Sequence, residues 1–144
     1  MKIVIDTNIV FSALLSHNSK IKSLILKDKL NEYYTCYSLF TEIFKNKERL
    51  CKISSLSLND LLKQMLIIFP KINIIPEEAI PKSIYKNAYN YCKDIDESDT
   101  PFIATAIFLK AKFLTGDKKL TKHLVNNGFT NVISLNEIIN KAST

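Results

Sequence analysis

Strand-like and helix-like segments alternate along the whole chain, and this alternation constrains the fold more than any other feature of the sequence. The first segment, residues 2–6, reads Lys-Ile-Val-Ile-Asp, which is typical of a short strand buried on both faces of a parallel sheet. A helical pattern follows it, and the same order recurs to the end of the chain. Such alternation favours an α/β fold in which helices connect parallel strands.

We therefore predict one α/β domain over residues 1–144, with a mostly parallel central sheet flanked by helices. No linker interrupts the pattern, and 144 residues is an ordinary length for one domain. The predicted strands are 2–6, Tyr33–Tyr37, Ile72–Ile75, Phe113–Thr115 and Asn131–Ser134. The predicted helices are 9–15, Lys20–Leu30, 38–51, 57–69, Pro81–Cys92, Phe102–Leu109, Lys118–Val125 and Leu135–Lys141.

Two of these helices carry signals at their beginnings. Ser38 can cap the helix that follows it, since a serine oxygen accepts a hydrogen bond from the first turn. Ser57 and Asp60 have the spacing of a capping box, and Pro70 ends the same helix. The apolar residues of that helix are Leu58, Leu61, Leu62, Met65 and Leu66.

The composition excludes several classes of protein. With only two glycines, the chain cannot form a glycine-rich dinucleotide loop or a P-loop, because each needs several such residues near phosphate. The longest apolar run, 65–69, is far too short to cross a membrane, and no secretory signal is recognisable. The three cysteines lack the spacing of a disulfide framework or a zinc site, and His17 and His123 are interpreted as surface residues. We expect a cytoplasmic protein that makes no contact with a membrane.

Four acidic residues fall where strands end or helices begin. Asp6 ends the first predicted strand, Asp117 follows the fourth, Asp99 opens the helix before it, and Glu42 lies in the opening turns of the helix after the second strand. Ligands of open parallel sheets bind beyond the carboxyl ends of the strands, so we expect these side chains to share one crevice. Converging carboxylates repel one another and favour a bound hard cation with oxygen ligands.

Each acid also has a purely structural interpretation. Asp6 is a good helix cap, Glu42 and Asp99 suit the positive end of a helix dipole, and Asp117 suits a turn. The coincidence of all four at such positions favours the functional interpretation.

The chain is basic, with twenty lysines and arginines against fourteen acids and a formal charge of +6. Such a field favours a polyanionic partner, although a solvated lysine-rich surface explains it equally well. Lysines can hold a phosphate backbone, and a metal bound by the nearby carboxylates can activate water. A site of this kind would hydrolyse phosphodiester bonds. We expect the lysines on either side of Asp117 in sequence to bind the substrate, namely Lys110, Lys112, Lys118, Lys119 and Lys122. The tyrosines that could stack on bases, but are as easily core or surface, are Tyr33, Tyr34, Tyr85 and Tyr89.

Four stretches of this sequence together resemble the PIN-domain family of nucleases. They are Ile-Val-Ile-Asp-Thr-Asn at 3–8, Glu42, Asp-Thr-Pro-Phe-Ile-Ala-Thr-Ala at 99–106, and Leu-Thr-Gly-Asp-Lys-Lys-Leu at 114–120. More narrowly, they resemble the VapC-like toxins of bacterial and archaeal toxin–antitoxin pairs. The resemblance spans nearly the whole chain.

The resemblance implies a metal-dependent endoribonuclease with a PIN-like fold. It implies that Asp6, Glu42, Asp99 and Asp117 bind Mg²⁺ or Mn²⁺, with Asn8 and Thr115 as polar supports behind them. It further implies an RNA substrate, a cognate antitoxin protein and a homodimer. Some PIN domains carry a further acid shortly after the position of Asp117, where this chain has lysines, and Asp96 is a possible outer substitute.

Two alternatives stay open at this point. A phosphatase of the haloacid-dehalogenase type also begins with a strand that ends in aspartate, but it needs a second aspartate where this chain has Asn8, and a late acid where it has Thr121. A non-catalytic PIN module that binds RNA or a partner protein would tolerate EDTA, whereas a nuclease of the predicted kind would not.

Overall fold

Five parallel strands form the central sheet of the computed structural model, which describes residues 1–15 and 19–142. The strand order is β3-β2-β1-β4-β5, and all four pairings are parallel. The prediction of an α/β fold with a parallel sheet is therefore confirmed. The strands are β1 (Lys2–Ile5), β2 (Glu32–Cys36), β3 (Ile72–Ile75), β4 (Lys112–Leu114) and β5 (Val132–Ile133). His17, interpreted above as a surface residue, lies outside the described residues.

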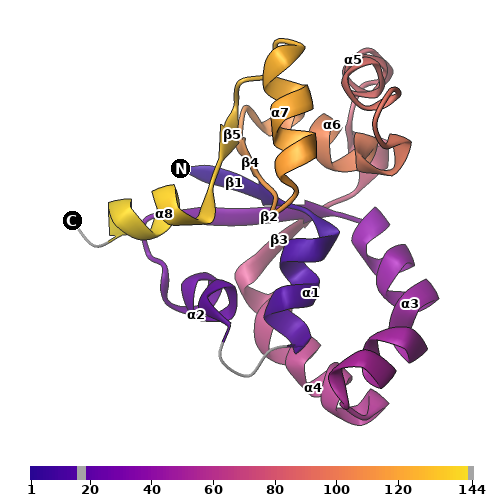
Figure 1. Ribbon diagram of the computed structural model, residues 1–144, viewed down its shortest axis with the longest axis vertical. Coiled ribbons are helices and arrows are strands. Elements are labelled where there is room, and N and C mark those ends of the chain that lie inside the picture. The colour runs from indigo at the N-terminus through magenta and orange to yellow at the C-terminus, as the bar shows by residue number, and fades with distance from the viewer. Residues whose placement is uncertain (16–18, 143–144) are drawn as a thin grey trace.

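Helices cover both faces of this sheet. The α-helices are α1 (Thr7–Leu15), α2 (Lys20–Lys27), α3 (Ser38–Ser54), α4 (Leu58–Ile68), α5 (Lys82–Cys92), α6 (Thr100–Leu109), α7 (Lys118–Asn126) and α8 (Leu135–Ala142). Short 3₁₀ turns are η1 (Phe69–Lys71), η2 (Glu77–Ala79) and η3 (Glu97–Asp99). Figure 1 shows α1, α2 and α4 on one side of the sheet, and α5, α6 and α7 on the other. In the described part of the chain, none of these helices is long and apolar enough to cross a membrane.

The core lies around β1, the middle strand of the sheet. Ile3, Val4 and Ile5 are all fully buried, as the continuous apolar run predicts for a strand covered on both faces. On one side, α6 packs across β1, β2 and β4 with an almost uninterrupted row of buried residues. The middle strand is thus held in place by helices above and below and by strands on both sides.

The chain changes direction across the sheet at β1. From β1 it proceeds to β2 and β3 on one side, and then returns to place β4 and β5 on the other. This arrangement creates a crevice beyond the carboxyl ends of β1 and β4, the place where open parallel sheets bind ligands. Asp6 directly follows β1, and residues 115–117 directly follow β4. The fold therefore brings together two chain segments that are far apart in sequence.

The beginning of α3 differs from the prediction. Ser38 is not the cap but the first helical residue, and Tyr37 precedes it without a capping side chain. Instead, Glu77 from η2 accepts hydrogen bonds from the Ser38 amide at 2.7 Å and the Ser38 hydroxyl at 2.5 Å. A carboxylate from a distant turn thus takes the place of a local cap. In contrast, the capping box of Ser57 and Asp60 is present as predicted.

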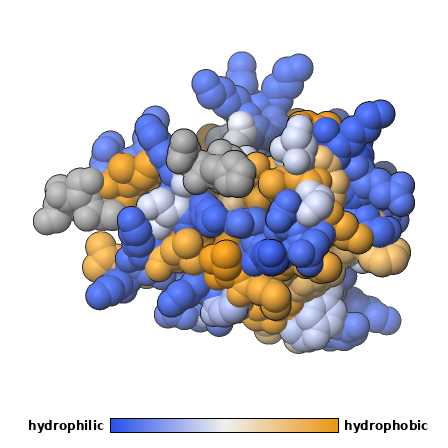
Figure 2. All heavy atoms as spheres, turned by 90° about the horizontal axis from the view of Figure 1, so that it is seen from below, coloured by the Kyte–Doolittle hydropathy of each residue, from blue (hydrophilic) through white to orange (hydrophobic). Residues whose placement is uncertain are grey.

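The apolar residues of α4 divide between the core and the surface. Leu61 and Ile68 are buried, whereas Leu58 and Leu62 are half exposed and Leu66 is 76% exposed. The three exposed leucines follow at four-residue intervals, so they form one stripe along the helix. Seen from below, the face of the molecule that includes α4 shows a broad apolar area among hydrophilic side chains (Figure 2). This stripe faces away from the core.

Candidate active site

Asp6 is the most buried acid of the candidate site, with 4% of its surface exposed. Its Oδ1 accepts a hydrogen bond from the Ile9 amide at 2.9 Å, so it does cap the beginning of α1. Its Oδ2 accepts a hydrogen bond from the Thr115 hydroxyl at 2.5 Å. The second bond joins the end of β1 to the end of β4 and fixes the carboxylate in the crevice. The structural and functional interpretations of Asp6 are therefore compatible.

Asp117 lies at the margin of the crevice and is exposed. Its Oδ1 accepts hydrogen bonds from the Lys119 and Leu120 amides at 3.0 and 3.1 Å, and so caps α7. Its own amide donates to the Thr115 hydroxyl at 3.1 Å. A chain of hydrogen bonds thus runs from Asp117 through Thr115 to Asp6. Thr115 therefore contacts both acids, through one hydrogen bond that it donates and one that it accepts.

A small cavity of about 200 Å³ lies beside Asp6 and is lined by polar residues throughout. The lining residues are Asp6, Thr7, Asn8, Glu42, Asp96, Ser98 and Asp99. Three of the four predicted acids therefore share one cavity, and the outer Asp96 joins them. Asp96 also accepts hydrogen bonds from the amide and hydroxyl of Ser98, which cap η3. Asp117 does not line this cavity.

The acids act strongly on one another. Burial raises the pKa of Asp99 to about 7, together with the charges of Asp96, Asp6, Asp117 and Glu42. Burial also raises the pKa of Asp6, against the hydrogen bonds from Thr115 and Ile9. Every charge that acts on Asp99 in this way is another carboxylate, and Asp117 is among them although it lies outside the cavity. Crowded acids of this kind are stabilised by a cation.

The donor set fits a hard divalent cation. Every side chain around the cavity that could bind a metal would offer an oxygen atom, and Mg²⁺ prefers oxygen ligands. The Thr7 hydroxyl is buried and has no hydrogen-bond partner among the described residues. Within residues 1–15 and 19–142, no three acidic, cysteine or histidine side chains are grouped as a ready-made metal cluster. One or two direct carboxylates with water between the ion and the others would match the habit of Mg²⁺.

Some of the predicted lysines lie near the carboxyl ends of the strands and others near the amino ends. Lys118 and Lys122 line a neighbouring cavity that also includes Asn8 and Thr115. Lys112 begins β4, and Lys110 follows the last residue of α6. Both therefore lie near the amino ends of the strands, whereas the acids lie near the carboxyl ends. Lys119 is exposed on α7. The structure therefore does not bring Lys110 and Lys112 near the candidate site.

Three contributors to the site were missed by the sequence analysis. Thr7 and Ser98 line the carboxylate cavity, and their positions beside Asp6 and Asp99 could have indicated this. Glu77 holds the beginning of α3, the helix that carries Glu42, through a contact between residues 39 positions apart. No local pattern marks such a contact.

Together, the fold and the site define an α/β protein with a crowded carboxylate cavity at the point where its parallel sheet changes direction. The sequence pattern of the PIN domain matches residues 4–137, and the chain belongs to the PIN domain family. The uncharacterized protein MJ1680 of Methanocaldococcus jannaschii is 36% identical over 125 residues, which cover 83% of this chain and 73% of that protein.

A solved structure gives the same fold. It is that of VapBC2 from Rickettsia felis, bound to a DNA fragment from its promoter. The matched chain superposes with a TM-score of 0.69 at 19% identity, over 93% of this chain and 97% of that chain. A likeness at this level of identity establishes the fold alone.

We expect Asp99→Asn to stabilise the metal-free protein at about pH 8 and to have little effect near pH 4. Asp99 has a pKa of about 7 in the folded protein. An unfolded aspartate titrates near ~3.9, so the free energy of unfolding falls as the pH rises between these values. Asparagine does not ionise, so Asp99→Asn removes this fall in the free energy of unfolding. Because Asp99 is partly exposed to water, we expect a gain of about 1–2 kcal/mol, measured by urea unfolding in EDTA.

Asp94→Asn is the matched control, because Asp94 is exposed in the turn before η3. Asp94→Asn should change the free energy of unfolding of the metal-free protein little. The crowding of acids around Asp99 is contradicted if Asp99→Asn changes the unfolding free energy equally at both pH values.

Proposed function

We propose that this PIN-domain protein is an endoribonuclease that uses Mg²⁺ or Mn²⁺ to hydrolyse RNA. The observation that carries the proposal is the cavity in which buried Asp6 meets Glu42, Asp96 and Asp99 at the switch point of the sheet. The net charge of +6 supports a polyanionic substrate, since an excess of positive charge attracts phosphate.

In this proposal the carboxylates of Asp6, Glu42 and Asp99 hold the metal, directly or through water, and Asp117 contributes charge from the margin. An ion held there would supply an activated water and would stabilise the leaving oxygen. Thr115 keeps the Asp6 carboxylate in one orientation through its 2.5 Å hydrogen bond. The residues themselves act by placing negative charge, and hydrolysis in such a site would need no covalent intermediate on the protein.

Two of the three cysteines are poorly suited to act as a protein nucleophile. Burial raises the pKa of Cys36 and of Cys92 to about 12, so both remain protonated thiols near neutral pH. A phosphatase of the haloacid-dehalogenase type is not favoured, because the second position after Asp6 is Asn8, whose amide cannot act as a general acid.

We expect Asp6→Asn, Asp99→Asn and Asp117→Asn each to reduce RNA cleavage by about 10²–10³-fold, because an amide binds divalent cations weakly and loses several kcal/mol of charge stabilisation. Glu42→Gln should be damaging as well. Asp117→Asn is informative because asparagine caps helices as well as aspartate does, so α7 should stay intact. Cleavage of mixed RNAs is measured with Mn²⁺, with Mg²⁺ and with EDTA.

The control for this series is Asp94→Asn, which should cleave like the parent protein. Cleavage that survives EDTA would exclude the metal mechanism. A parent protein that binds RNA but never cuts it, with or without metal, would favour the non-catalytic module instead.

We further propose that the nuclease is the toxin of a toxin–antitoxin pair. Another cavity, about 650 Å³ in volume, lies between α1 and α3 and includes the apolar side chains of Phe11, Leu15 and Ile53. Asn8 lines both this cavity and the carboxylate cavity. An amphipathic antitoxin segment could fill the apolar cavity and extend an arginine or lysine toward the acids.

Expression of this protein alone should arrest bacterial growth, because an unrestrained ribonuclease destroys cellular RNA. Co-expression of the protein encoded in the neighbouring reading frame should relieve the arrest, and so should Asp6→Asn. Growth is measured together with the amount of soluble protein. Normal growth at high levels of soluble parent protein would remove the toxin role and leave the nuclease proposal intact.

A homodimer is also proposed, and the exposed stripe of Leu58, Leu62 and Leu66 on α4 supports it. Apolar surface of this kind gains free energy when a second copy covers it. Light scattering after size exclusion should give a dimer for the parent protein and a monomer for the double variant Leu62→Lys, Leu66→Lys. A monomeric parent protein would overturn the proposal.

A further inference from the structure

A groove next to the carboxylate cavity lies between α3 and α5. It has a volume of about 670 Å³, and η3 with the beginning of α6 forms its inner end. The carboxylate cavity and this groove share Glu42 and Ser98. The groove therefore leads directly to the proposed metal site.

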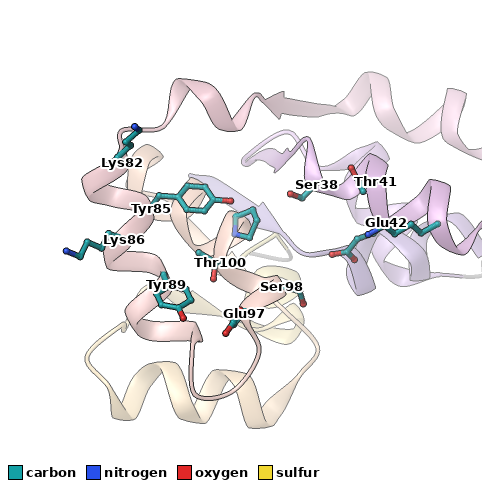
Figure 3. A pocket seen from close by; sticks show the side chains of 12 residues that line it. Ser38, Thr41, Glu42, Lys82, Tyr85, Lys86, Tyr89, Glu97, Ser98 and Thr100 are labelled. Carbon is teal, nitrogen blue, oxygen red and sulfur yellow. The ribbon is translucent and has the colours of Figure 1, made fainter.

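One face of α5 forms the outer wall of this groove. Lys82, Tyr85, Lys86 and Tyr89 all line it, and their spacing of i, i+3, i+4 and i+7 places them along one side of the helix. Figure 3 shows the Tyr85 ring reaching from α5 toward Ser38 on α3, with Tyr89 one turn further along α5. In the same view, Lys82 extends from the beginning of α5, and the Lys86 side chain extends from α5 on the side away from α3.

The opposite wall adds a third cation. Lys45 follows Glu42 by one turn of α3 and lines the groove from that side. The acids in the lining are Glu42, at the junction with the carboxylate cavity, and Glu97 on η3. Positive charge thus lies along the two long walls, while the acids lie at the inner end where the metal would be.

The two tyrosines offer different contacts. Tyr89 is 41% exposed, so much of its side chain is available to a ligand. Tyr85 is half-buried, and burial together with the charge of Glu77 raises its pKa to about 12. Its hydroxyl therefore stays protonated near neutral pH and can donate a hydrogen bond. Aromatic faces with lysines beside them are the features that bind single-stranded nucleic acid.

We propose that the groove between α3 and α5 binds the single-stranded stretch of RNA next to the bond that is cut. Tyr89 stacks on a base, Tyr85 donates to the strand from its hydroxyl, and Lys45, Lys82 and Lys86 neutralise phosphates along the walls. This inference rests on the proposed nuclease function, because it takes its direction from the metal site. In this proposal the substrate is bound by residues of α5, and not by Lys110 and Lys112 near the amino ends of the strands.

Binding is tested separately from cleavage. All variants are made on an Asp99→Asn background and titrated in EDTA with a labelled, unstructured RNA of about 12 nucleotides, a length within the range that such grooves occupy. Tyr89→Leu should weaken binding by about 5- to 100-fold, because it removes one stacked base. The double variant Lys82→Gln, Lys86→Gln should reduce the slope of log K against log salt by about 1.4, since each lost phosphate contact removes ~0.7.

The matched control is the double variant Lys27→Gln, Lys29→Gln, which removes two exposed lysines near the beginning of β2, at the opposite edge of the sheet. It should leave the binding affinity nearly unchanged. Thermal unfolding of each variant establishes that α5 remains folded. Photocrosslinking of RNA that contains 5-iodouridine, followed by mass spectrometry, should place the adduct on Tyr89 or Tyr85.

The outcomes separate the two proposals. If the parent protein does not cut RNA but the α5 variants lose binding as described, the nuclease function fails and the groove stands as an RNA-binding site. If the parent protein cuts RNA while folded α5 variants bind and cut like it, the groove proposal is overturned and the nuclease function stands. The groove proposal is also overturned if the α5 variants keep their affinity for RNA but no longer bind a protein partner.

Discussion

The hydrogen bond between Thr115 and Asp6 is the interaction on which the rest of the site depends. Burying a carboxylate is costly, and two donors from different elements offset that cost here, the Ile9 amide and the Thr115 hydroxyl. Because Thr115 follows β4 and Asp6 follows β1, the bond also fixes the two strands that flank the switch point. The hydrogen bond from Thr115 thus both holds the two strands beside the crevice and orients the carboxylate of Asp6.

The sheet could be predicted because its strands are buried on both faces. Such strands leave continuous apolar runs, as in Ile3–Ile5, and turn residues separate them clearly from the helices. The beginning of α3 could not be predicted in the same way, since its partner Glu77 comes from beyond the next strand. The exposed leucines of α4 show the same limit. Their spacing indicates an apolar helix face but does not determine what covers it.

The acids of the candidate site were easier to predict than the lysines around it. Asp6, Glu42 and Asp99 follow or precede elements whose direction is known in a parallel sheet, so their common edge can be inferred from the sequence. Lys110 and Lys112 are close to Asp117 in sequence, but β4 separates them from it in space. On α5, by contrast, helical spacing alone groups Lys82 with Tyr85, although only the fold shows that this face lies beside Glu42.

The crowding of acids favours a bound cation whether or not a substrate is present. At neutral pH the repulsion among Asp6, Asp96 and Asp99 lowers the stability of the folded state, since the same charges are far apart in the unfolded chain. A cation in the cavity offsets this repulsion, so its binding free energy adds to the free energy of unfolding. The lysines of α5 lie outside the cavity and leave this repulsion in place. The molecule thus separates the charges that would hold the metal from the charges that would hold the RNA, and Glu42 stands at the boundary between them.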